Sequence, residues 1–216
     1  MHLKCKVIII WVSVVLLVGC QKNVAEVEEF NKPAQHWYKK IAQSIDAGHM
    51  DKADAFYISL KSEHMRSALM STAIIMLAQA HMQKEEYKLA DYYLDEYNRR
   101  YAGNANREYI EFMKVKASFL GITNPYKDQK LIMDSIYKAK QFIARYPGSD
   151  YAPLVNTVLI KLQMGQYLLN ENIAALYART KKPLAATFYR HKNDNSLFKM
   201  ADIKAPEKTF LGKIFD

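Results

Sequence analysis

The apolar positions between residues 33 and 192 recur with the spacing of amphipathic helices. From Pro33 onward, Trp37, Ile41 and Ile45 lie four positions apart, and Gly48 ends the run. Residues three and four apart share one face of an α-helix, whereas a half-buried strand alternates apolar and polar positions. No segment of the sequence sustains that alternation. The pattern therefore predicts an all-α protein.

Three more apolar stripes follow at the same spacing. The first opens after Asp51, a residue type that suits a helix N-cap. The stripes consist of Ala53, Phe56, Tyr57 and Leu60; then Leu69, Ala73, Leu77 and Ala80; then Tyr87, Ala90, Leu94, Tyr97 and Tyr101. Because the breaks between them are short, the sequence predicts paired helices joined by tight turns.

The helix pairs repeat along the chain. Residues 50–53 match residues 87–90 after a shift of 37, which also aligns Trp37 with Ile74. This shift is close to the period of about 34 residues of tetratricopeptide repeats. Residues 97–101 match residues 142–146 only after a shift of 45. We expect a long turn near residues 121–128 to absorb the excess.

The last part of the pattern predicts a fourth repeat and a terminal piece. A helix is expected from Asp150 and Pro153 to about Tyr167, followed by helical pieces at 170–180 and 183–192. Since one repeat cannot bury its apolar face alone, the pairs must stack into a curved solenoid with a concave groove. The predicted fold is a tetratricopeptide-like solenoid of about four helix pairs over residues 33–192, with an irregular tail at 193–216.

The first helix of each repeat is expected to face the groove. In the repeat register this places Tyr38, Ala42, Ile75, Gln79 and Met82 there. Methionine and aromatic side chains adapt their contacts, so such a surface suits extended or poorly folded chains. Most other aromatic residues on the stripes are explained by packing between helices.

The N-terminal residues have the order of an export signal. Lys4 and Lys6 precede an apolar run from Val7 to Val18, which is shorter than the roughly 20 residues that span a bilayer. The sequence from Leu17 to Cys20 resembles the bacterial lipobox, in which the cysteine is acylated. We expect residues 1–19 to be a signal peptide, Cys20 to carry lipid and residues 20–32 to form a tether. The alternative is an ordinary signal peptide in which Cys20 is incidental.

Cleavage at this site changes the composition of the chain. It removes Cys5 and two lysines, so the one remaining cysteine is used as a thioether and the mature chain keeps 29 basic and 22 acidic residues. This moderately basic charge suits anionic lipid or an acidic partner surface. Export makes nucleic acid an unexpected partner. By resemblance to known sorting rules, Gln21 after the cysteine favours the outer membrane.

Sequence motifs of enzymes and metal sites are absent from the chain. There is no HExxH, CxxC, GxSxG or glycine-rich phosphate loop. His81 is expected to be an ordinary helix residue, and Glu85 and Glu86 to favour the N-terminal dipole of the next helix. We therefore predict no catalytic residue, no metal site and no cofactor.

Two segments resemble a known family. The string Arg145-Tyr146-Pro147-Gly148-Ser149-Asp150-Tyr151-Ala152 and the segment from Ala174 to Arg190, together with the lipobox, are similar to the BamD (YfiO or ComL) family. That family is the lipoprotein subunit of the machine that folds β-barrel proteins into the bacterial outer membrane.

The resemblance implies attachment through Cys20, docking of the C-terminal repeats to the periplasmic domain of the barrel-forming subunit BamA, and contact between the N-terminal groove and unfolded barrel proteins. It also implies a docking role for Arg190, whose alternative is a solvated surface arginine. The chain departs from the family pattern because it lacks a complete fifth repeat.

Two other interpretations stay open on the sequence. The first is a different tetratricopeptide lipoprotein, one that organises peptidoglycan synthesis or secretin assembly. The second is an accessory that docks an envelope enzyme. The tail also has two interpretations, since Phe210, Leu211, Ile214 and Phe215 either cap the solenoid or bind a partner or lipid.

Overall fold

The computed structural model describes residues 29–199 except 102, 104–105, 125–127 and 197. Contacts within the chain divide it after Lys32, into residues 1–32 and 33–216. The predicted signal peptide, Cys20, most of the tether and the tail from residue 200 lie outside the described residues. The described residues form eight helices and no strand, which confirms the all-α prediction.

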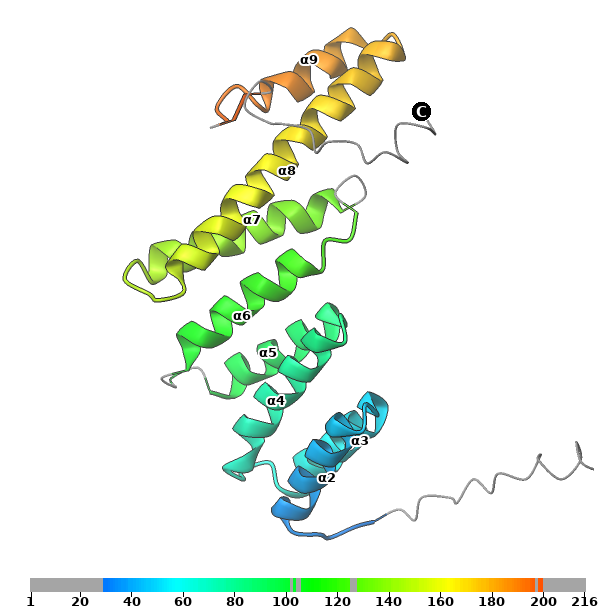
Figure 1. Cartoon of the computed structure of the whole chain (residues 1–216), viewed down its shortest axis with the longest axis vertical. Helices are drawn as coiled ribbons and strands as arrows, with labels where there is room; N and C mark the ends of the chain where they lie inside the picture. Colours follow the sequence, from blue (N-terminus) through cyan, green and yellow to red (C-terminus); the bar gives the residue numbers. More distant parts are fainter. Residues whose placement is uncertain (1–28, 102, 104–105, 125–127, 197, 200–216) are drawn as a thin grey trace, which may run out of the picture. The chain divides into compact units, whose positions relative to one another are not determined.

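The helices follow one another closely along the chain (Figure 1). They are α2 (Ala34–Asp46), α3 (Met50–Glu63), α4 (Leu69–Gln83), α5 (Tyr87–Arg100), α6 (Arg107–Leu120), α7 (Gln129–Arg145), α8 (Ala152–Arg179) and α9 (Pro183–His191).

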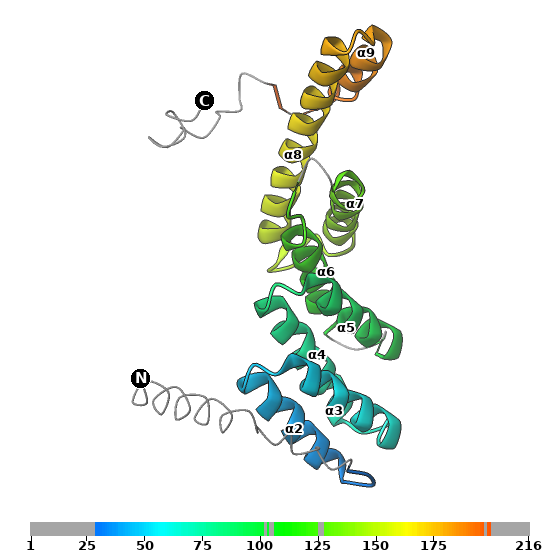
Figure 2. The ribbon, with the colours of Figure 1, turned by 90° about the vertical axis from the view of Figure 1, so that its right-hand side faces the viewer.

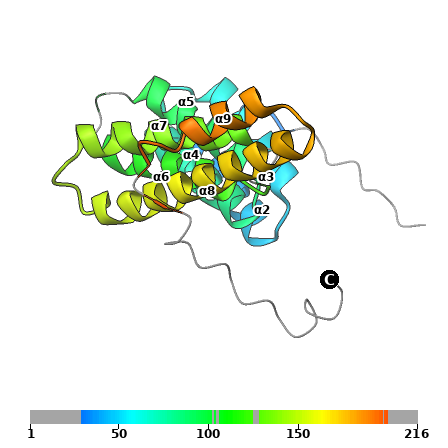
Figure 3. The same cartoon turned by 90° about the horizontal axis from the view of Figure 1, so that it is seen from above.

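Consecutive helices pack in pairs, and the pairs stack (Figure 2). α2 packs against α3, α4 against α5, α6 against α7 and α8 against α9, while α3, α5 and especially α7 also contact the first helix of the next pair. First helices touch as well, α2 with α4 and α6 with α8. Figures 1 and 3 show α9 running back beside the second half of α8. This is the predicted tetratricopeptide-like solenoid, in which each pair contacts its neighbours.

The N-terminal pairs share one hydrophobic core because their apolar stripes face each other. Trp37 of α2 is buried in the same cluster as Tyr57 and Leu60 of α3. Its ring stacks on Phe56, with centroids 6.1 Å apart, and its Nε1 donates a hydrogen bond to Glu63 at 2.8 Å. The largest side chain of the first pair is therefore buried, and its one polar group, the indole N–H, has a hydrogen-bond acceptor.

Two smaller apolar clusters hold the C-terminal helices. One lies where α6, α7 and α8 meet, and the other lies mainly between α7 and α8. Their buried members are Val115, Ala139, Phe142 and Val155 in the first and Ile132, Ile136, Leu162 and Leu169 in the second. α6 links these clusters to the N-terminal core, because its Ile110, Met113 and Ala117 belong to that core and its Phe112 packs against both the core and the first smaller cluster.

Three of the first helices end in the same turn. The residue after each helix cap lies in the left-handed region: Gly48 after α2 (φ 76°), Glu85 after α4 (φ 62°) and Lys181 after α8 (φ 58°). The spacing from Gly48 to Glu85 is the 37-residue shift that the sequence shows. The closing bonds run from His49 N–H to the Ser44 carbonyl (2.8 Å), from Glu86 N–H to the His81 carbonyl (2.8 Å) and from Lys182 N–H to the Tyr177 carbonyl (2.9 Å).

The repeat spacing also predicts the connection in the third pair. α6 ends at Leu120 and α7 begins at Gln129, which leaves the expected long turn between them. Gly121 ends α6 with a helical φ of −70° and does not form the left-handed turn of the other pairs.

Two predicted helix boundaries are wrong. α3 begins at Met50 with His49 at the N-cap position, so Asp51 lies in the first turn and is not the cap. α8 continues from Ala152 to Arg179 without the predicted break after Tyr167. No proline interrupts this stretch, and Gly165 weakens a helix without ending it, because glycine still adopts helical dihedrals.

Candidate partner-binding surfaces

Five residues predicted to face the groove lie on α2 and α4. Tyr38 and Ile75 are half-buried and pack against the N-terminal core. Gln79, one turn after Ile75, is exposed, and its Nε2 donates a hydrogen bond to the Tyr109 hydroxyl of α6 at 2.8 Å. The structure thus joins α4 to α6 along this edge. We call it the first-helix surface, made of Tyr38, Ala42, Ile75, Gln79 and Tyr109.

Met82 does not lie on the first-helix surface, which corrects the prediction. Its side chain is 9% exposed and belongs to the N-terminal core cluster. α4 packs against α2, α3 and α5, so neighbouring helices cover more than one side of it. A helix that is enclosed in this way buries residues outside its main apolar stripe, which a single stripe in the sequence does not reveal.

A buried histidine joins three helices. His81 of α4 is fully buried, with Nδ1 2.6 Å from the Glu86 carboxylate and Nε2 3.0 Å from Asp54 of α3. The Tyr93 hydroxyl of α5 donates to the same Asp54 oxygen at 2.6 Å. Burial alone would lower the pKa of His81, but hydrogen bonds to the two carboxylates raise it above its ordinary value. The protonated ring satisfies both acceptors.

A buried glutamate forms a second charged centre. Glu96 of α5 is 2% exposed, and its Oε1 accepts from Lys61 of α3 and from Arg100, both at 2.9 Å. Burial alone would raise its pKa, but Lys61, Tyr57 and Arg100 lower it below its ordinary value. Sequence reasoning missed both this residue and the role of His81. The available signal was an ionisable residue inside an apolar stripe, since such residues are rarely buried without partners.

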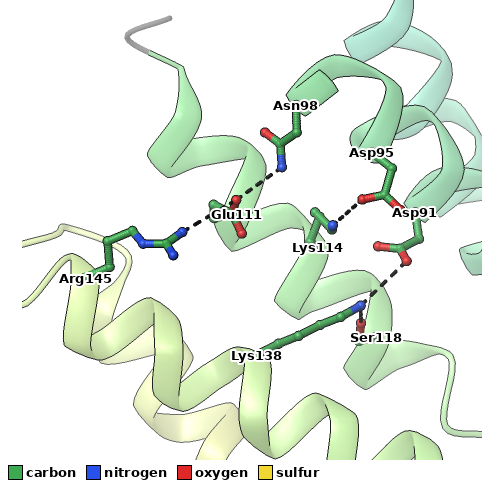
Figure 4. A network of polar contacts seen from close by, with 8 residues as sticks. All are labelled: Asp91, Asp95, Asn98, Glu111, Lys114, Ser118, Lys138 and Arg145. Carbon is green, nitrogen blue, oxygen red and sulfur yellow. Dashed lines mark hydrogen bonds and ion pairs between the residues drawn. The ribbon is translucent and has the colours of Figure 1, made fainter. Parts of the chain in front are cut away.

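Polar contacts join α5, α6 and α7 (Figure 4). Lys114 of α6 donates to Asp95 of α5, and although burial lowers its pKa, the nearby carboxylates raise it overall. The other contacts are Lys138 to Asp91 (3.6 Å), Lys138 to Ser118 (2.8 Å), Asn98 to Glu111 (3.2 Å) and Arg145 to Glu111 (3.9 Å). These pairs add polar contacts to the apolar packing of α6 against α5 and α7, so their arrangement is that of a joint between helices.

The segment from Arg145 to Ala152 connects α7 to α8 and packs against α6. Ser149 Oγ donates a hydrogen bond to Glu108 of α6 and accepts one from the Tyr151 backbone N–H at 3.0 Å. The Tyr151 ring stacks on Phe112 of α6, with centroids 4.5 Å apart and planes 12° apart. The string that carries the family resemblance is therefore a structural joint, where the connection between α7 and α8 packs on α6.

Arg190 lies on α9, far along the chain from the first-helix surface. Its side chain is exposed, and its guanidinium makes no hydrogen bond or ion pair with any described residue. It lies in the last turn of α9, where the helix dipole favours a cation. The position leaves the guanidinium accessible to an acidic group of a partner.

Residues after α9 are tied to α8. Asn193 Nδ2 donates to the Tyr167 carbonyl at 3.1 Å and to Glu171 at 2.8 Å, and its Oδ1 accepts from Asn170 at 2.9 Å. A cleft of about 350 Å³ lies beside these contacts, between α7, α8 and α9. Asn193, which the sequence places in the tail, thus fastens the end of α9 to α8.

None of the described helices combines the length and the apolar character needed to cross a membrane. Among the same residues, no three histidine, cysteine, aspartate or glutamate side chains gather as metal ligands.

Stacked helix pairs with an exposed first-helix surface define a tetratricopeptide-like repeat protein, a class that presents extended surfaces for binding. The family model described as YfiO, outer membrane lipoprotein, matches residues 30–193, and the chain belongs to this family.

Two curated proteins are similar to the chain. Outer membrane protein assembly factor BamD of Helicobacter pylori is 37% identical over 215 residues, which cover the whole chain and 98% of that protein. Outer membrane protein assembly factor BamD of Caulobacter vibrioides is 24% identical over 209 residues, which cover 90% of the chain and 67% of that protein. These matches confirm the resemblance that the sequence motifs indicate.

Proposed function

We propose that this chain is the lipid-anchored scaffold of the machine that assembles β-barrel proteins in a bacterial outer membrane. The observation that carries the proposal is the 37% identity to an assembly factor along the full length of the chain. Cys20 is acylated after removal of residues 1–19 and holds the helices on the periplasmic face. Two or more acyl chains are needed for such firm attachment. The scaffold acts by binding and requires neither catalysis nor a cofactor.

The C-terminal helices dock to the BamA-like barrel-forming subunit, and Arg190 contributes to the contact. The exposed guanidinium in the last turn of α9 supports this role. Arginine binds a carboxylate through two parallel hydrogen bonds, which gives both strength and orientation. The expected counterpart is therefore an aspartate or glutamate on the partner.

The first-helix surface contacts unfolded barrel proteins before they insert. Tyr38 and Ile75 offer partly buried apolar area, and Gln79 offers an exposed amide. An amide side chain both donates and accepts hydrogen bonds, so it can pair with the backbone of an extended chain. This combination favours extended segments of varied sequence.

The docking role is tested by isolating the full-length lipoprotein from its own membranes in mild detergent and identifying its partners by mass spectrometry. We compare the native chain with Arg190→Glu and with Arg99→Glu. Arg99 is a matched control because it is also an exposed arginine in the last turn of its helix. We expect to recover a BamA-like subunit with the native chain and with the control. The amount recovered with Arg190→Glu should be lower by about tenfold or more, because charge reversal breaks an interfacial ion pair.

Two results would count against the proposal. Recovery of peptidoglycan-synthesis or secretin components alone would contradict a role in barrel assembly. Equal recovery of the BamA-like subunit with all three chains would keep that role and remove Arg190 from the docking contact.

A further inference from the structure

The end of the α8–α9 hairpin combines exposed apolar side chains with positive charge. Residues 172–193 contain five lysines and arginines and no aspartate or glutamate. Leu184 is 87% exposed, and Phe188, one turn later on the same face of α9, is 58% exposed. Single exposed apolar residues are common, but this pair lies within a stretch that is basic between Glu171 and Asp194, and Asp194 pairs with His191 at 2.6 Å.

Cations flank the apolar pair at both ends of α9. Lys181 and Lys182 form the turn before the helix and are exposed. After the helix, Lys192 Nζ lies 4.9 Å from the centre of the Phe188 ring and 4.6 Å from that of Tyr189. The turn therefore places two exposed lysines just before Leu184 in the chain, with the Lys182 ammonium 6.0 Å from the centre of the Tyr177 ring, and the Lys192 ammonium lies over the ring of Phe188.

Arg190 is separate from this face. It lies six residues after Leu184, which places it about 120° away around the helix axis. Docking through Arg190 and a contact through Leu184 and Phe188 therefore use different sides of α9.

We propose that this hairpin tip binds the surface of an anionic lipid bilayer. The tip consists of Arg179, Lys181, Lys182, Leu184, Phe188 and Lys192. Its cations pair with anionic headgroups, while Leu184 and Phe188 enter the boundary between headgroups and acyl chains. The long lysine side chains keep their ammonium groups in the headgroup layer as the apolar pair enters.

Charge and area favour lipid over a protein at this tip. A stable protein interface buries about 800 Å² on each partner, with apolar side chains packed at its centre. The tip offers a short turn and two apolar side chains, which suits a fluid surface that does not need shape complementarity. The inference rests on the proposed anchoring through Cys20, because the acyl chains hold the helices near a membrane.

The test uses the full-length acylated lipoprotein in vesicles, with Leu184→Cys carrying an environment-sensitive fluorophore. Cleavage removes Cys5 and acylation occupies Cys20, so the introduced thiol is the one that reacts. The vesicles contain either equal parts of phosphatidylglycerol and phosphatidylcholine or phosphatidylcholine alone. The control is the same label at Ile58→Cys on α3, where the native side chain is 65% exposed.

We expect a blue shift of the Leu184→Cys label, and quenching by lipids with spin-labelled acyl chains, in the vesicles that contain phosphatidylglycerol. High salt should reduce both effects because it screens the charges. The label at Ile58→Cys should show neither effect.

A charge variant tests the electrostatic part. Lys181→Gly with Lys182→Gln removes two cations, and glycine suits the φ of 58° at residue 181, so the turn is kept. The ratio of membrane-bound to free tip should fall by about 25-fold at low salt, roughly fivefold for each cation. Lys39→Gln with Lys116→Gln removes two exposed cations from α2 and α6 and should leave the ratio unchanged.

Three outcomes would overturn the lipid contact. The first is equal fluorescence of the two labels in anionic vesicles. The second is a Leu184→Cys label that is shielded in the absence of vesicles and becomes exposed in a variant truncated after Lys199. That result would show that the C-terminal tail covers this site. The third is a shift that requires a BamA-like subunit. The mass of the purified chain reports the acylation of Cys20 separately, so failure of the anchor and failure of the lipid contact are distinguishable.

Discussion

At the scale of single residues, His81 and Glu96 show how buried charges hold the N-terminal helices in register. His81 of α4 contacts a carboxylate on α3 and another at the start of α5. Glu96 of α5 accepts hydrogen bonds from Lys61 of α3 and from Arg100. Because unpaired charges are costly in a protein interior, these groups favour one arrangement of the helices over shifted alternatives.

The stability of the chain should depend on pH through His81. Its folded pKa is raised above the unfolded value of about 6.5, so the protonated ring stabilises the fold fully below that pH. This contribution is lost as the pH rises through the folded pKa. Urea unfolding of the native chain and of His81→Gln should give a difference in free energy that shrinks as the pH increases above about 6.5. A difference that does not change with pH would contradict this account.

Removal of the Glu96 charge should destabilise the same helices. Glu96→Gln leaves Lys61 and Arg100 without their shared carboxylate, and we expect a loss of about 2 kcal/mol, since both cations can partly turn to solvent. Denaturant unfolding near neutral pH measures the change. Asp46→Asn, an exposed acid at the end of α2, is the matched control and should change stability by less than about 0.5 kcal/mol. Equal effects of the two substitutions would show that the buried ion pairs contribute little.

At the scale of helices, Gly48 in the turn after α2 and Gly165 inside α8 have opposite roles. Gly165 lies inside α8, and a Cβ there would meet no atom within 4 Å. Gly48 has a φ of 76° in the turn after α2. Gly165 adopts a helical conformation that other residues also adopt, so glycine there only adds conformational entropy to the unfolded chain. Gly48 is needed because its backbone has a positive φ.

Alanine at these two positions should therefore have effects of opposite sign. Gly165→Ala should stabilise the fold by about 0.5–1 kcal/mol. Gly48→Ala should destabilise it by about 1 kcal/mol because alanine is strained at positive φ. Thermal and denaturant unfolding of the two variants provide the comparison. Destabilisation by Gly165→Ala would indicate that α8 needs a bend at that residue.

The sequence predicts the helices better than the contacts between them. Apolar stripes and the 37-residue shift locate the pairs, since both follow from helix geometry and repeat length. The predicted exposure of Met82 is wrong because the burial of a central helix depends on the helices packed around it, which an apolar stripe in the sequence does not reveal. The partners of His81 could not be predicted either, since Asp54 lies 27 residues away on another helix. The binding roles of Tyr38, Ile75, Gln79 and Arg190 stay predictions.

At the scale of the molecule, residues 33–199 place two candidate surfaces on different helices of one solenoid. The first-helix surface lies on α2, α4 and α6, and Arg190 lies on α9. Between them, α6 contributes buried residues to the N-terminal core and to the next apolar cluster, and the polar contacts of Figure 4 join it to α5 and α7. Because each repeat mainly contacts its neighbours, the two surfaces are built by different repeats.

The central claim is that the chain supports assembly of outer-membrane β-barrels. The most direct test is to deplete the protein in its own cells and measure how much of a major β-barrel protein is folded in the outer membrane, using its heat-modifiable migration in gels. The account predicts that folded barrel protein declines as the chain is depleted and that the native chain restores it, whereas Cys20→Ala does not. Unchanged amounts of folded barrel protein after full depletion would contradict the account.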